Sequence, residues 1–110
     1  MRAARLRRSS DIATLRAEGR SLRRAAFTVR VRRTDRSEAR LAVVAPRAVG
    51  GAVARNRARR RVREAFRVAL TQRGLDAGVD ILVTARPEAL HTEFTAIRDD
   101  AANVLSEATS

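Results

Sequence analysis

A run of seven arginines with a single acid is the feature that most limits how this chain folds. Residues 52–67 read AVARNRARRRVREAFR, and the only acid between Arg55 and Arg67 is Glu64. Arginines four residues apart on one helix repel each other and cost an isolated helix about 0.2–0.5 kcal/mol per pair. A helix of this sequence therefore persists most easily where a negatively charged partner neutralises its arginines.

The apolar residues of this segment recur at the spacing of one helix face. On a helical wheel most arginines spread over the opposite side, with Arg59 at the margin and Arg55 near the entrance. Gly50-Gly51 lead into the helix, and Gly74 is its expected C-terminal cap. A solvated face normally mixes charges of both signs, so this face favours binding of a polyanion over simple exposure to solvent. The apolar stripe consists of Ala54, Ala58, Val62, Ala65, Phe66, Ala69 and Leu70.

The rest of the chain predicts short helices and strands around this helix. Ser9-Ser10 and Gly19 bound a short helix, and Arg20 to Ala26 is either a short strand or a loop. Alternation or short apolar runs predict strands at 27–31, 41–45 and 80–85, with a polar turn at 34–38. The spacing of Leu90, Phe94, Ile97, Ala101, Val104 and Leu105 predicts a final helix. This order predicts an α/β fold, a single-domain α+β sandwich over residues 1–110. Residues 1–8 are expected to form a flexible basic N-terminus, and 106–110 a frayed C-terminus.

The charge is concentrated in the first two-thirds of the chain. Up to Arg73 there are 22 arginines against five acids, and from Gly74 onward two against seven. Such a surface is typical of proteins that bind nucleic acid or an anionic membrane. A membrane-surface helix needs a free apolar face, and here that face is needed for the core. Guanidinium groups bind phosphate in bidentate fashion and stack on bases, so nucleic acid is favoured and no membrane partner is expected.

Several classes of protein are excluded by composition. There is no cysteine, which removes disulfides and zinc–cysteine sites, and no apolar run approaches the roughly 20 residues that span a bilayer. The first 27 residues are rich in arginine, serine and alanine, like a transit peptide, but Asp11 and Glu18 argue against that reading. A cytoplasmic location is expected. His91 and the pair Asp99-Asp100 are interpreted as surface residues.

One motif makes the prediction specific. RNRARRRVRE, from Arg55 to Glu64, follows Val49-Gly50-Gly51-Ala52-Val53, and together they closely resemble the signature of the bacterial ribonuclease P protein subunit. Arg5-Leu6, Asp11, Gly19-Arg20 and the stretch from Asp80 to Pro87 resemble further positions of that family. The resemblance extends over nearly the whole chain.

The resemblance implies an αβββαβα fold with a small central sheet and a left-handed strand–helix–strand crossover, against the general right-handed preference. It also implies the function of a ribonuclease P subunit, in which a catalytic RNA removes the 5′ leader of precursor tRNA. The expected partners are that RNA and precursor tRNA, with no obligate protein partner. Mg²⁺ would be held with the RNA, and no catalytic or metal-binding side chain is expected from the protein. One histidine, no cysteine and no spaced carboxylate cluster agree with this.

The resemblance also assigns residues to two surfaces. Contacts to the RNA subunit are implied for Arg55, Asn56, Arg57, Arg59, Arg60, Arg61 and Arg63, and helical spacing adds Arg67. Asn56 either reads a base edge or fixes the helix entrance. The second surface is a cleft for the single-stranded leader, expected to include Ile12, Arg16, Phe27, Arg30, Arg47 and Arg86. For Phe27 the alternation of its strand favours a place in the core over one in the cleft. Ile12, Arg16 and Arg30 stand where the family often has aromatic residues, so we expect arginine stacking and charge to hold the leader here.

Two other functions remain open from the residues. The main alternative is a non-enzymatic, basic RNA-binding accessory protein of the ribosome-associated type, which uses the same helix. A nuclease that acts without RNA is the other, and it would need metal-binding carboxylates or a histidine base that the sequence does not supply.

Overall fold

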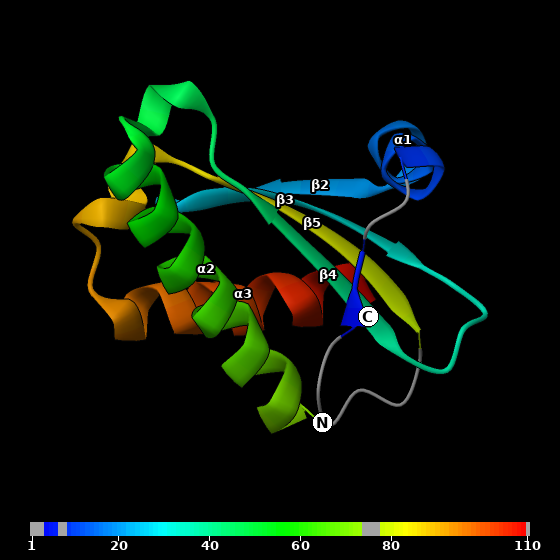
Figure 1. Ribbon diagram of the computed structural model, residues 1–110. Coiled ribbons are helices and arrows are strands. Elements are labelled where there is room, and N and C mark those ends of the chain that lie inside the picture. The colour runs from blue at the N-terminus through cyan, green and yellow to red at the C-terminus, as the bar shows by residue number, and fades with distance from the viewer. Residues whose placement is uncertain (1–3, 7–8, 74–77, 110) are drawn as a thin grey trace.

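A computed structural model describes residues 4–6, 9–73 and 78–109 (Figure 1). Its helices are α1 (Ser9–Glu18), α2 (Ala52–Arg73) and α3 (Phe94–Thr109), with short 3-10 turns η1 (Arg47–Val49) and η2 (Pro87–Leu90). Its strands are β1 (Ala4–Arg5), β2 (Arg20–Arg23), β3 (Phe27–Arg33), β4 (Ala39–Val44) and β5 (Val79–Ala85). The predicted single α/β domain and its order of helices and strands are confirmed, with β1 as an unpredicted addition.

The strands form one mixed sheet in the order β1-β4-β5-β3-β2. β4 runs parallel to β5 on one side and to β1 on the other, while β3 is antiparallel to both β5 and β2. The connection from β4 to its parallel neighbour β5 passes through α2, which is the crossover that the family resemblance predicts to be left-handed.

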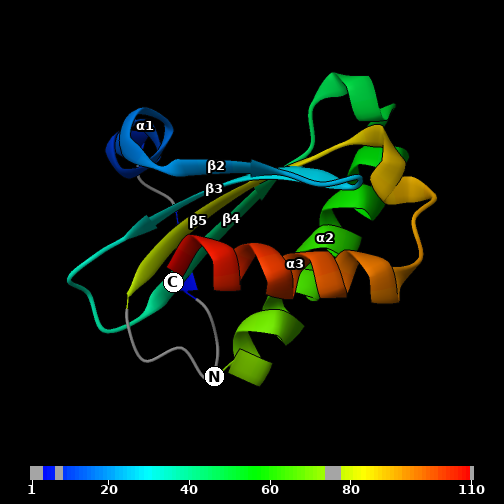
Figure 2. The same cartoon turned by 180° about the vertical axis from the view of Figure 1, so that it is seen from behind.

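One face of the sheet carries the core. Alternation places Phe27, Val29 and Val31 of β3 on this face, where α2 and α3 cover it (Figures 1 and 2). The ring of Phe27 meets that of Phe66 edge to face, with centroids 5.0 Å apart. A second, smaller cluster lies on the opposite face, where α1 packs through Leu15 against Leu6 and Leu82.

The chain ends differ from expectation. Ala4–Arg5 pair with β4 and the Leu6 side chain is buried, so these residues do not fit a flexible terminus over 1–8; residues 1–3 and 7–8 lie outside the described part. At the other end α3 continues to Thr109, so 106–109 are helical rather than frayed. Leu90, expected on the final helix, lies in η2, because Pro87 starts a separate short turn.

Candidate nucleic-acid interface

The helix α2 is positioned by its apolar stripe. Ala58, Val62, Ala65 and Phe66 are fully buried in the core shared with α3 and the sheet. Gly50 sets the entry, because its φ of 140° is a conformation that side-chain-bearing residues rarely adopt, and a Cβ there would lie 2.9 Å from the Ala54 Cβ. The predicted cap Gly74 lies outside the described residues.

Three of the eight predicted RNA-contacting residues form no hydrogen bond or ion pair with any described residue. Arg57 and Arg60 are exposed and make no hydrogen bond or ion pair with any described residue. Arg63 is half-buried, and burial, followed by the charges of Arg5 and Arg59, lowers the pKa of its guanidinium from the ordinary value. A bound anion would offset both the burial of this charge and its repulsion by Arg5 and Arg59.

These residues surround a hollow. Asn56, Arg59, Arg60 and Arg63 line a cavity of about 270 Å³ on the outer side of α2. The Asn56 side-chain oxygen accepts a hydrogen bond from Arg59, so Asn56 orients an arginine of this cavity. The charge of Arg5 in β1 also acts on Arg63. In the sequence Arg5 only matched a position of the family, and no RNA contact was predicted for it. The cavity therefore offers convergent guanidinium groups of the kind that bind phosphate.

The other predicted arginines of α2 have partners within the protein. The Arg55 Nε donates to the Ala45 carbonyl at 2.9 Å, and Arg61 donates to the carbonyls of Ala89, at 2.9 Å, and Thr92. Arg67 forms a two-bond pair with Glu64, in which Nε lies 2.9 Å from one carboxylate oxygen. Arg55 and Arg61 therefore fix α2 to its neighbours, and the charge of Arg67 is balanced.

A second hollow lies on the sheet face that α1 partly covers. It has a volume of about 270 Å³, and Arg30 donates a hydrogen bond of 3.0 Å to the Arg16 carbonyl across it. The structure therefore brings two predicted leader-cleft residues together and surrounds them with hydroxyl groups. The lining residues are Arg16, Ser21, Thr28, Val29, Arg30, Leu82 and Thr84.

A buried ion cluster holds α1 over this face. The Asp80 side chain is 3% exposed and receives two hydrogen bonds from Arg40, at 2.7 and 2.6 Å. Arg40 also donates to Asp11 of α1 at 3.1 Å. The hydrogen bonds to Asp80 have the largest effect on the pKa of the Arg40 guanidinium, and they raise it. The bond to Asp11 also raises this pKa, while burial lowers it. Sequence reasoning missed this cluster, because the pairing depends on the register that places Arg40 opposite Asp80.

The remaining predicted cleft residues lie elsewhere. Phe27 is fully buried on the opposite face against Phe66, so its assignment to the cleft is wrong; the alternation of β3 turns it into the core. Ile12 packs into the small cluster under α1. Arg47 is exposed in η1, and Arg86 donates to the carbonyls of Arg24 and Ala25 and pairs with Glu88. None of these four lines the hollow.

Within residues 4–6, 9–73 and 78–109, no three His, Asp or Glu side chains gather in a way that suits a metal ion. Over the same ranges no helix has the length and apolar character needed to cross a bilayer.

A small α/β domain with an outward cationic helix and a polar cleft belongs to the class of nucleic-acid-binding folds. Comparison with known proteins makes this more specific. The ribonuclease P family model matches residues 1–109. The ribonuclease P protein component of Chloroflexus aurantiacus is 44% identical over 97% of this chain and 78% of its own length. This chain belongs to the family of ribonuclease P protein components.

Solved structures agree with that membership. The ribonuclease P protein from Thermotoga maritima superposes with a TM-score of 0.78 at 33% identity, over 94% of this chain and 96% of the other. The Staphylococcus aureus protein has the same fold, with a TM-score of 0.75 at 24% identity over 96% and 95% of the two chains. Family members are subunits of ribonuclease P, an endoribonuclease of tRNA processing, and membership implies association with its RNA.

Proposed function

We propose that this chain binds the catalytic RNA of ribonuclease P through α2 and the 5′ leader of precursor tRNA through the hollow beside α1. Mg²⁺-dependent hydrolysis would be carried out by the RNA, with Mg²⁺ bound there. The observation that supports the proposal most is the exposed face of α2, where Arg57, Arg60 and Arg63 have no acid partner among the described residues. Phosphates of a folded RNA supply the missing negative charge.

The hollow proposed to hold the leader is lined by positively charged and hydroxyl side chains. Arg16 and Arg30 supply positive charge, and Ser21, Thr28 and Thr84 supply hydroxyl groups. Hydroxyls and guanidinium groups bind phosphate and ribose, which every nucleotide has. We therefore expect the leader to be held mainly by its backbone, with arginine stacking on bases as a secondary contribution.

Replacing Arg16 with glutamine should weaken binding of precursor tRNA to the holoenzyme about fourfold to fivefold at roughly 0.15 M salt, the effect of one lost phosphate contact. Binding of mature tRNA, which has no leader, should not change. Arg30→Gln should act in the same direction, although it also removes the bond to the Arg16 carbonyl. The measurement is the ratio of the two dissociation constants, with Arg36→Gln, an exposed arginine outside the hollow, as the control. Equal losses for precursor and mature tRNA would exclude a leader-binding role.

The function itself is tested by adding the purified chain to a bacterial ribonuclease P RNA at low Mg²⁺ and following leader removal. The proposal predicts that cleavage is restored at Mg²⁺ concentrations where the RNA alone is inactive, because bound arginines reduce the phosphate repulsion between RNA and substrate. Binding without restored cleavage would instead support an accessory RNA-binding protein. Cleavage by the chain without RNA would indicate a nuclease.

A further inference from the structure

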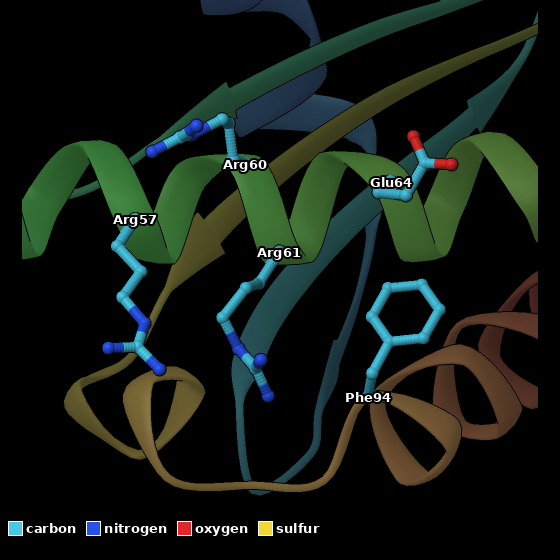
Figure 3. Close-up of a pocket in the computed structure, with 5 residues that line it drawn as sticks. All are labelled: Arg57, Arg60, Arg61, Glu64 and Phe94. Carbon is cyan, nitrogen blue, oxygen red and sulfur yellow. The ribbon is translucent and has the colours of Figure 1, made fainter.

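A third hollow, apart from the two already described, lies where α2 meets the start of α3. Its volume is about 430 Å³, and it is lined by Arg57, Arg60, Arg61 and Glu64 of α2 and by Phe94 of α3 (Figure 3). The four α2 residues follow the spacing of one helix face. The volume lies within the range of about 300–1000 Å³ that is usual for small-ligand sites.

Phe94 gives this hollow an aromatic surface. The chain has three phenylalanines and no tyrosine or tryptophan, and Phe27 and Phe66 are fully buried. Phe94 is half-buried: it packs against the core and also borders the hollow. It is therefore the only phenylalanine ring that reaches the surface, and it does so beside the cationic helix.

The charges around the ring are arranged to accept an anion. Arg57 and Arg61 extend from α2 toward the same side as Phe94, while the Glu64 carboxylate points away from the ring (Figure 3). Arg61 is held by the carbonyls of Ala89 and Thr92, so its charge is fixed at the wall of the hollow. Glu64 is balanced by Arg67, and Arg57 makes no hydrogen bond or ion pair with a described residue. The Phe94 ring borders the same hollow as the guanidinium of Arg57, which has no acid partner among the described residues. This combination suits a planar group that carries a phosphate.

We propose that this hollow binds one unpaired nucleotide of the RNA subunit, with its base stacked on Phe94 and its phosphate on Arg57. The base must be unpaired, because only a base splayed out of a helix offers its face to a side chain. The inference rests on the proposed function and adds to it a stacking contact on α3, outside the arginine motif. Phe94 would thus add a contact whose strength does not depend on salt.

The test compares RNA-subunit affinity for the wild-type chain, Phe94→Leu and Phe94→Trp. Leucine keeps the apolar packing and loses the stacking surface, so affinity should fall about fivefold to 150-fold, the effect of one lost base stack. Tryptophan should retain wild-type affinity or exceed it. The dependence of affinity on salt should stay the same in all three, because no phosphate contact is removed. Leu22→Ala, at a partly buried residue of β2 that packs on the same core, controls for loss of stability, which is followed by thermal melting.

Several results would overturn the proposal. Wild-type affinity for Phe94→Leu would do so, and so would equal losses for the leucine and tryptophan variants. An effect confined to precursor tRNA binding would assign the hollow to the substrate instead. If AMP raised the melting temperature of the wild-type chain but not of Phe94→Leu, while RNA affinity stayed equal, the site would belong to free nucleotides. Failure of the wild-type chain to bind the RNA would contradict the proposed function itself.

Discussion

Replacing Asp80 with alanine is expected to lower the free energy of unfolding by about 3–5 kcal/mol, the usual cost of removing one partner of a buried ion pair. The whole Asp80 residue is 2% exposed. Its loss leaves the Arg40 guanidinium, whose side chain is 11% exposed, with Asp11 as its one remaining acid partner among the described residues. Chemical denaturation followed by circular dichroism measures the change. A loss below about 1 kcal/mol would show that the cluster contributes little.

A paired replacement separates the charge from the packing. Arg40→Met combined with Asp80→Leu removes both charges and fills similar volume, so it should recover most of the stability that Asp80→Ala loses. Because Arg40 also bonds to Asp11, the double variant should leave the sheet stable but α1 less firmly held. We then expect weaker binding of precursor tRNA to the holoenzyme, since Arg16 of α1 lines the proposed leader surface.

Replacing Arg57, Arg60 and Arg63 together with glutamine should weaken binding to the ribonuclease P RNA about 100-fold at roughly 0.15 M salt. Each phosphate contact contributes a slope of about −0.7 to −0.9 in a plot of log affinity against log salt, and the loss follows from three contacts. The fold should survive, because Arg57 and Arg60 have no partner among the described residues. Removing repulsion along α2 should even stabilise the free chain slightly.

The matched control removes the same charge elsewhere. Arg23, Arg33 and Arg36 are exposed on β2, on β3 and in the turn after β3, and replacing all three with glutamine gives the same net charge. Long-range attraction to RNA falls equally in both variants, so the difference between them reports contacts made by α2. Equal losses in the two triple variants would mean that net charge, and not this helix, determines binding.

The elements of the fold were predictable where a residue pattern repeats. The 3.6-residue spacing of Ala58, Val62 and Phe66 places arginines on the outer face of α2 whatever the helix packs on. Alternation in β3 likewise turns Phe27 inward, and this local signal outweighs the family expectation of a cleft aromatic. β1 was not predictable, because two residues carry no period, and its parallel pairing with β4 comes from a distant part of the chain.

The hydrogen-bond partners of individual side chains could not be predicted from the sequence. Arg55 and Arg61 look equivalent to Arg57 in the motif, yet they donate to carbonyls of Ala45 and Ala89, and these acceptors come near only after folding. Periodicity placed Phe94 on the apolar face of the last helix but could not show that its ring also borders a hollow beside α2. Such details depend on tertiary packing, so they follow from the structure and not from local pattern.

A salt titration of binding tests most directly whether guanidinium groups of α2 contact phosphates of the RNA subunit, as proposed. Affinity is measured for the wild-type chain and for the triple variant at Arg57, Arg60 and Arg63 over a range of salt concentrations. The predicted result is a steep linear fall of log affinity with log salt for the wild type, and a slope shallower by about 2 to 3 for the variant. Parallel lines for the two proteins would contradict the account.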